Sequence, residues 1–246
     1  RYQELSRNGQ EKKWQTLNLI FKRRLNSIKP ELEHKYMKIM LDCSPKKIHE
    51  YRDKYNADLW QLRTPLTQYA LAGVPYGLDN GCFKRFKRKQ WERLLDEAES
   101  QMPKFVTLPD IVGDAVRTLD LFDAFERQTN GLPRALVLQD GIGNHRIEWS
   151  KLSAVFVGGS DNFKISDEAF NACRTAKMLG KWVHVGRVNT ASRVKNWLGL
   201  ADSIDGSGIS KYDHMLEDVL TAINETHPQE EIHFNEQIKF KKRLGE

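Results

Sequence analysis

The chain reads AVFVGGSDN at residues 154–162, a short apolar run that ends in glycines and polar side chains. A pattern typical of a helix follows it. The same event recurs at five other places: GVPYGLDNG (73–81), KFVTLPD (104–110), RALVLQDG (134–141), KWVHVGRVN (181–189) and LADSIDGSG (200–208). Continuous apolar runs without a two-residue alternation are typical of strands that a parallel sheet buries on both faces. We therefore expect six parallel strands.

Helical patterns separate these runs. Apolar side chains fall at helical spacing over 87–100, 114–128, 166–180, 190–199 and 211–225. This alternation, in a chain of 246 residues, has the pattern and size of a TIM-like (β/α) barrel. The barrel can be irregular, because only residues 59–66 and 68–73 are candidates for the two missing strands. An open doubly wound sheet is the structural alternative.

The first 62 residues carry helical spacing and basic side chains but few strand signals. Within them, Ser44 and Pro45 are typical of a helix start, because serine caps a helix and proline is tolerated at its first position. We expect a helical extension over 1–62 that packs on the barrel, a catalytic barrel core over 63–226 and a charged tail over 227–246. The extension is either a packing layer or an arm that faces nucleic acid.

Composition narrows the class of protein. The formal charge of +6 is compatible with a nucleic-acid substrate. The three cysteines lie far apart without zinc-binding spacing, so we expect no metal site, and free thiols indicate a reducing, cytoplasmic compartment. No run approaches 18 apolar residues, and we expect no membrane span.

Carboxylates follow several of the predicted strands. Asp79, Asp110 and Asp205 end three runs, and the carboxyl ends of barrel strands are where active sites are built. Two carboxylates there can divide labour between nucleophile and proton transfer. For Asp79 the alternative is a simple turn, because Asp-Asn-Gly bends a chain readily. Asp202 lies three residues before Asp205, so it points to the opposite strand face and we expect it to be structural. His184 is predicted to be a packed core histidine.

Amide and glycine residues end other strands. Asn80 follows Asp79, and Gln139 can donate and accept hydrogen bonds in one plane, which suits a purine edge. Glycines allow a ligand to approach backbone N–H groups. The end of the 154–162 run offers three further candidates: Gly158, Gly159 and Ser160. The alternative for these three is a phosphate loop in an enzyme of phosphorylated small molecules.

A basic and aromatic stretch, FKRFKRKQW at 83–91, follows Asp79 directly. Cations interleaved with aromatic rings suit a phosphate backbone and unstacked bases. The alternative is a solvated helix start whose phenylalanines lie in the core. The candidate nucleic-acid contacts are Lys84, Arg85, Lys87 and Arg88, together with Arg187.

Taken in order, these clusters resemble the tRNA-guanine transglycosylase superfamily, over roughly residues 75–210. Its Asp-Ser-Gly-Gly-Phe segment is similar to LDNGCF, with Asp79 at the acid/base position. Its base-reading Asp, Gln-Gly and Gly-Gly segments are similar to Asp110, Gln139–Gly141 and Gly158-Gly159. Its Leu-Met-Gly-Val-Gly strand resembles WVHVG, which adds Gly186 to the base-binding set. Its Asp-Met-Phe-Asp-Cys segment resembles DSIDG, which implies that Asp205 is the nucleophile.

The chain also departs from that family. The Cys-rich zinc subdomain and the Pro-Thr-Arg after the nucleophile are absent. A short, zinc-less chain with a basic helical front looks most like the viral DNA 7-deazaguanine transglycosylases. The resemblance implies a pentosyltransferase that exchanges guanine in DNA for a free 7-deazaguanine base through a covalent Asp205–glycosyl intermediate, without cofactor or metal. The alternatives are an enzyme that acts on tRNA and a non-catalytic barrel that binds nucleic acid.

Overall fold

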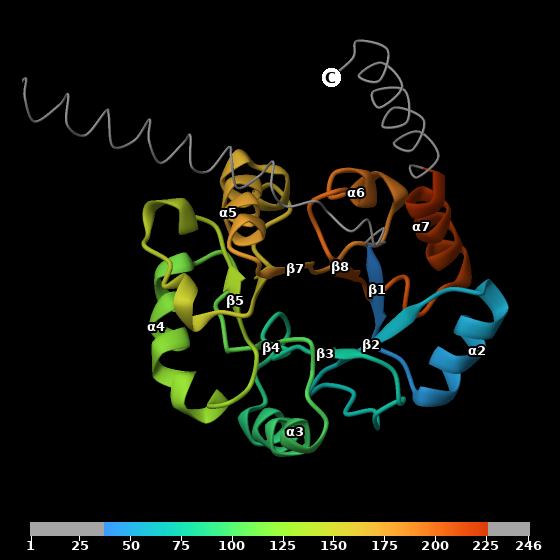
Figure 1. Ribbon diagram of the computed structural model, residues 1–246, viewed down its shortest axis with the longest axis horizontal. Coiled ribbons are helices and arrows are strands. Elements are labelled where there is room, and N and C mark those ends of the chain that lie inside the picture. The colour runs from blue at the N-terminus through green and yellow to red at the C-terminus, as the bar shows by residue number, and fades with distance from the viewer. Residues whose placement is uncertain (1–36, 226–246) are drawn as a thin grey trace, which may run out of the picture. The chain divides into compact units, whose positions relative to one another are not determined.

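The computed structural model describes residues 37–225, which form a closed barrel of eight parallel strands (Figure 1). The strands are β1 (Lys38–Leu41), β2 (Leu59–Arg63), β3 (Tyr76–Leu78), β4 (Val106–Thr107), β5 (Arg134–Leu138), β6 (Ala154–Val157), β7 (Trp182–Val185) and β8 (Ser203–Asp205). Each strand pairs with the next in sequence, and β1 closes the ring against β8 with Met40 opposite Asp205. The predicted TIM-like (β/α) barrel is confirmed, with all six predicted strands in place.

Within residues 37–225, six α-helices lie outside the ring of strands (Figure 1). They are α2 (Pro45–Tyr55), α3 (Arg88–Ser100), α4 (Ala115–Phe125), α5 (Asp167–Met178), α6 (Ala191–Lys195) and α7 (Asp213–Glu225). No α-helix follows β2 or β5. Between β5 and β6 the chain forms only two short 3-10 helices, η2 (Ile142–Asn144) and η3 (Trp149–Lys151). Two further 3-10 helices of the described residues lie elsewhere: η1 (Glu126–Thr129) and η4 (Phe163–Ile165). The barrel is therefore irregular.

Side-chain caps start several helices where the sequence indicates. Ser44 accepts a hydrogen bond from the Lys47 amide at the start of α2, and Ser166 accepts one from the Ala169 amide at the start of α5. Asp114 caps α4 in the same way. Each cap satisfies one N–H group that the first turn leaves without an intrahelical acceptor. Among residues 37–225 no helix combines the length and the apolar character that crossing a membrane requires.

Buried apolar side chains pack on both faces of the strands. Outward side chains such as Ile39, Val155 and Ile204 pack against the helices. Inward side chains fill the barrel itself: Met40, Leu62, Phe105, Ala135, Val137, Ala154, Phe156 and Trp182. This two-residue alternation decides which face of each strand reaches the barrel interior.

The expected boundary at residue 62 is wrong. Strands β1 and β2 both begin before residue 63, and the helix that begins at Pro45 is the first helix of the barrel. Strand β1 is only four residues long and begins with a lysine, which is why it does not stand out from the helical patterns around it. Residues 1–36 of the expected extension and the tail over 227–246 lie outside the described residues.

The candidate strand at 68–73 is a loop, whereas 59–66 does contain β2. The Gln61 side chain donates to the Ala70 carbonyl at 2.9 Å and accepts from the Ala72 amide at 3.0 Å. Arg63 Nε donates to the Tyr69 carbonyl at 2.9 Å. Side chains of β2 thus satisfy the loop backbone, which removes the need for a neighbouring strand.

Asp202 is predicted to stabilise the fold without serving the barrel mouth. Its buried carboxylate accepts from the Val183 amide at 2.9 Å and from Lys177 Nζ of α5 at 2.7 Å. Asp202→Ala leaves the buried amide without that acceptor, so we expect the free energy of unfolding to fall by about 1–3 kcal/mol. Urea unfolding followed by circular dichroism measures this. Asp218→Ala, at an exposed position of α7, is the control; an equal loss there contradicts the role of Asp202.

Candidate active site

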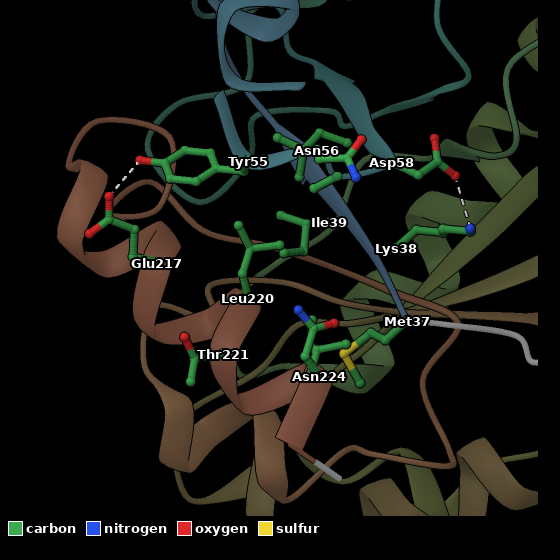
Figure 2. A pocket seen from close by; sticks show the side chains of 13 residues that line it. Met37, Lys38, Ile39, Tyr55, Asn56, Asp58, Glu217, Leu220, Thr221 and Asn224 are labelled. Atoms are coloured by element: carbon green, nitrogen blue, oxygen red, sulfur yellow. Dashed lines mark hydrogen bonds and ion pairs between the residues drawn. The ribbon is translucent and has the colours of Figure 1, made fainter. Parts of the chain in front are cut away.

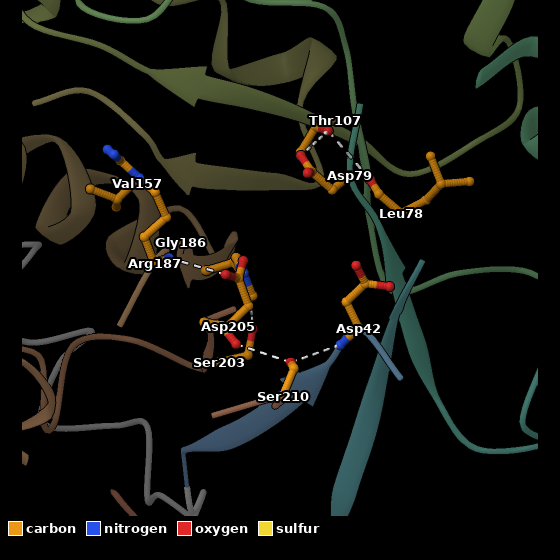
Figure 3. Close-up of polar contacts among 12 residues, drawn as sticks. Asp42, Leu78, Asp79, Thr107, Val157, Gly186, Arg187, Ser203, Asp205 and Ser210 are labelled. Atoms are coloured by element: carbon orange, nitrogen blue, oxygen red, sulfur yellow. Dashed lines mark hydrogen bonds and ion pairs between the residues drawn. The ribbon is translucent and has the colours of Figure 1, made fainter. Parts of the chain in front are cut away.

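A cavity of about 300 Å³ lies at the carboxyl ends of the barrel strands. Four carboxylates line it: Asp42 after β1, Asp79 after β3, Asp110 after β4 and Asp205 at the end of β8. Figure 3 shows Asp42, Asp79 and Asp205 around a common space. The carboxyl end of a parallel barrel is the usual position of an active site. Most of the sequence-predicted site residues line this cavity; those that do not are Ser160, Gly186, Arg85, Lys87 and Arg88.

Two hydrogen bonds hold the carboxylate of Asp205. The Arg187 amide donates to Oδ1 at 3.0 Å (Figure 3), and His184 Nε2 lies 3.1 Å from Oδ2. The side chain is largely buried, with 8% of the residue exposed. Asp202 points out of the barrel to Lys177, so the two carboxylates occupy opposite faces, as their spacing predicts.

Asp79 lies at the cavity in surroundings that perturb its carboxyl group. Burial, together with the charges of Asp205 and Asp110, raises the pKa of Asp79 to about 7. Thr107 Oγ1 lies 3.4 Å from its Oδ1 (Figure 3). A carboxyl group with a pKa near neutrality can both donate and accept a proton at physiological pH. The turn interpretation alone does not account for this environment.

Asp110 is the centre of a buried polar network. Its Oδ1 accepts from Asn80 Nδ2 at 2.8 Å, and its Oδ2 accepts from Gln139 Nε2 at 2.6 Å. Burial raises the pKa of Asp110, although the bond from Asn80 opposes this. Asn80 also donates to the Leu108 carbonyl at 2.6 Å. The Cys82 thiol is a further hydrogen-bond partner of Asp110 and also opposes the rise in its pKa, so a ligand in the cavity would compete with that thiol for the remaining lone pairs of the carboxylate.

The amides at the end of β6 do not form an open anion site. The N–H of Gly158 donates to the Leu138 carbonyl, that of Gly159 to Gln139 Oε1 at 2.9 Å, and that of Ser160 to Asp140 Oδ2 at 2.8 Å. The expectation that they cradle a ligand is wrong for these three N–H groups. Gln139 Oε1 also accepts from the Gly113 amide, so towards a ligand Gln139 acts chiefly as a donor.

Two glycines of the candidate set are required by packing. A Cβ at Gly186 would lie 2.6 Å from the Phe156 ring, and a Cβ at Gly159, which has φ of +68°, would lie 2.4 Å from Phe163. Contacts this short exclude a side chain at either position. The protein's own rings therefore explain both glycines.

The basic and aromatic stretch divides between the cavity and the core. Phe83 and Lys84 line the cavity, and Phe83 is 59% exposed. In contrast, Phe86 and Trp91 pack edge to face with Phe125 of α4, so they do not stack on bases. Arg88 pairs with Glu92 at 2.7 Å and lies over the Phe125 ring. Arg85 is exposed and Lys87 is half-buried; neither lines the cavity.

Arg187 contacts Asp205 through its backbone and Phe83 through its side chain. Its backbone adopts φ of +62°, which directs its amide to Asp205. Its guanidinium lies 4.3 Å from the centre of the Phe83 ring and donates to the Gly159 carbonyl. The predicted nucleic-acid contact therefore also holds the candidate nucleophile.

Sequence reasoning missed three groups at the site. Asp42 accepts from Thr67 Oγ1 at 2.6 Å, and burial and the charge of Asp205 raise its pKa. Lys164 is buried and donates to the carbonyls of Val157 and Gly186; burial, then the charge of Arg187, lowers its pKa to about 7. His184 contacts Asp205. Asp42 follows an apolar run, as the other candidate carboxylates do, so its position at the barrel mouth could have been predicted from the sequence. The partners of Lys164 and His184 depend on tertiary structure and could not.

A second cavity, of about 350 Å³, lies between β1, the end of α2 and α7 (Figure 2). Four of its polar side chains form two pairs: Lys38 with Asp58 at 2.9 Å, and Tyr55 with Glu217 at 3.0 Å. Within residues 37–225, His, Cys, Asp and Glu side chains form no cluster of three or more that could hold a metal ion.

Comparison with models of known protein families and with curated protein sequences gives no match. Among solved structures, a mutant of flavocytochrome B2 superposes with a TM-score of 0.40 at 14% identity. The match covers 77% of this chain and 62% of that one, so the chain spans less than two thirds of the flavocytochrome. A similarity of this degree carries no information on function.

Proposed function

We propose that the protein exchanges guanine in DNA for a 7-deazaguanine derivative through a covalent intermediate on Asp205. The observation that carries the proposal is the shared cavity: Asp205, held by two N–H donors, and Asp79, with a pKa of about 7, face it together with the base-edge group Asp110. The order of these residues along the chain, which resembles the tRNA-guanine transglycosylases, supports the same assignment.

The first half-reaction forms the intermediate. A carboxylate oxygen of Asp205 attacks C1′ of the target nucleotide as the C1′–N9 bond breaks. The electron pair of that bond leaves with guanine, which takes a proton from the carboxyl group of Asp79. The products are free guanine, a glycosyl ester on Asp205 and an ionised Asp79.

The second half-reaction reverses these steps with a new base. The ionised Asp79 removes the N9 proton of the incoming 7-deazaguanine, whose N9 attacks C1′ and expels the carboxylate of Asp205. Asp79 is protonated again and Asp205 is free. No electron is gained or lost in the sequence, so the exchange consumes no oxidant or reductant.

Base recognition follows from the lone pairs of Asp110. A guanine-type base presents two neighbouring donors, N1–H and the N2 amino group, which match the two acceptors of a carboxylate. The second N–H of Gln139 Nε2 remains available to the O6 acceptor, because the first donates to Asp110. The buried network of Asp110, Asn80 and Gln139 fixes these groups before the base arrives.

The charges around the cavity suit a nucleotide. Carboxylates line its interior, whereas the cations Lys84, Arg187 and Lys211 also border it. A base inside and phosphates at the rim fit this division. Because a base paired in a duplex is out of reach of the interior, we expect the target to be extruded or single-stranded. The alternative of an enzyme that binds a phosphorylated small molecule through a loop at 158–160 is disfavoured. The N–H groups of Gly158, Gly159 and Ser160 already donate to acceptors within the protein.

An exchange assay tests the proposal. Incubation with labelled guanine and either DNA or tRNA, followed by nucleoside analysis, should place label in DNA; label in tRNA alone contradicts the substrate. Asp205→Asn should abolish both exchange and the adduct on denaturing gels, because an amide is a far weaker nucleophile, while Asp202→Asn should keep both. DNA binding by the Asp205 variant is the control for folding. Undiminished exchange in that variant refutes the mechanism.

The first half-reaction should depend on the protonation of Asp79. Its raised pKa keeps it protonated below about pH 7, so the rate of guanine release should be high there and fall about tenfold per pH unit above it. Rapid-quench measurement of released guanine gives this profile. Asp79→Asn should lower the rate by roughly 10²–10⁴ and remove the inflection. An inflection that persists in the variant assigns the proton to another group.

The cations at the cavity should contribute to the salt dependence of DNA affinity, whereas Arg88 on α3 should not. Lys84→Ala and Lys211→Ala should each lower the slope of log affinity against log salt by about 0.7–0.9, as expected for one phosphate contact. Arg88→Ala should leave the slope unchanged, because Glu92 and Phe125 engage that side chain. Fluorescence anisotropy of a labelled oligonucleotide at several salt concentrations measures the slope. An equal change in the Arg88 variant indicates that DNA runs along α3.

A further inference from the structure

A chain of buried hydrogen bonds crosses the barrel interior and ends at Asp205. Trp182 Nε1 donates to Ser203 Oγ at 2.8 Å, Ser203 Oγ lies 2.8 Å from His184 Nδ1, and His184 Nε2 lies 3.1 Å from Asp205 Oδ2. All four residues are buried. They alternate along β7 and β8, two inward positions on each strand, with His184 opposite Ser203 in the register.

The partners determine which nitrogen of His184 carries the proton. An indole N–H can only donate, so Ser203 Oγ accepts from Trp182 and its own hydrogen is free for Nδ1 of His184. A carboxylate can only accept, so Nε2 must donate to Asp205. The neutral Nε2–H tautomer satisfies every one of these contacts.

The surroundings of the ring favour the neutral form. Its centre lies 4.9 Å from that of Phe105 and 4.7 Å from that of Phe156. Burial lowers the pKa of His184, and the bond to Asp205 opposes this only in part. The charged groups that act on it are Asp205 of β8 and Lys164 of η4, the second of which adds to the lowering.

We propose that His184 is a positioning residue: as a neutral Nε2–H donor, oriented through Ser203 by Trp182, it fixes the carboxylate of Asp205 for attack. The nucleophilic role of Asp205 rests on the proposed function. With the Arg187 amide on Oδ1 and His184 on Oδ2, both oxygens are held in place. A neutral donor stabilises the ionised carboxylate without pairing it with a full positive charge, which would lower its reactivity.

Nitrogen-15 NMR of the full-length protein, with labelled histidine, tests the tautomer without any assay of exchange. Spectra from about pH 6 to 8 should contain a neutral Nε2–H signal pair that is absent from His184→Gln. Ser203→Ala should change this pair, because Nδ1 loses its donor. An imidazolium or an Nδ1–H tautomer at His184 overturns the proposal.

Single-turnover formation of the DNA adduct tests the positioning role. His184→Phe keeps an aromatic ring between Phe105 and Phe156 but removes the donor, so the rate should fall roughly 10- to 100-fold, with little change in DNA affinity. His184→Gln, which can still donate, should recover part of the rate. Asp202→Asn, at a buried carboxylate outside the chain of bonds, is the matched control. A His184→Phe rate within twofold of wild type refutes the role.

The two proposals fail separately. If the wild-type protein forms no adduct while the NMR spectra contain the Nε2–H tautomer, the transglycosylase function is wrong and the hydrogen bond from His184 to the carboxylate stands. If the adduct forms but His184 is charged, the function stands and the positioning role is wrong.

Discussion

The pairing of the first strand with the last is the constraint on which the site depends. β1 lies parallel to β8, with Met40 opposite Asp205, and the Lys38 amide donates to the Asp202 carbonyl at 2.9 Å. Because all eight strands run in one direction, closure brings their carboxyl ends to one rim. In an open sheet β1 and β8 would lie at opposite edges, and the carboxylates of Asp42 and Asp205 could not share a cavity.

The site gathers negative charge at a cost to stability. The donors to its carboxylates are mostly neutral: Thr67, Asn80, Gln139, His184 and the Arg187 amide. Burial of carboxylates without paired cations raises their pKa values, as at Asp42, Asp79 and Asp110, and costs folding free energy. An arrangement that local stability does not favour is typical of a functional site.

Much of this architecture could be predicted from local pattern. The six apolar runs predicted strands, and the spacing of Asp202 and Asp205 predicted their opposite orientations, because both depend only on neighbours in sequence. Long-range packing was not accessible. Long-range packing leaves Phe83 exposed but places Phe86 against Trp91, although all three residues lie in one stretch of sequence. The contact of His184 with Asp205 depends on β8 being its neighbour in register, which no property of residues 181–189 reveals.

The internal use of the β6 amides also has a consequence for selectivity. With the N–H groups of Gly158, Gly159 and Ser160 consumed by the protein, the Asp110 carboxylate and the Gln139 amide nitrogen are left to meet the edge of the base in the proposed function. Adenine would place the lone pair of its N1 against the lone pairs of Asp110, where guanine offers an N–H. Discrimination between the two purines would then come from repulsion of the wrong base as much as from attraction of the right one.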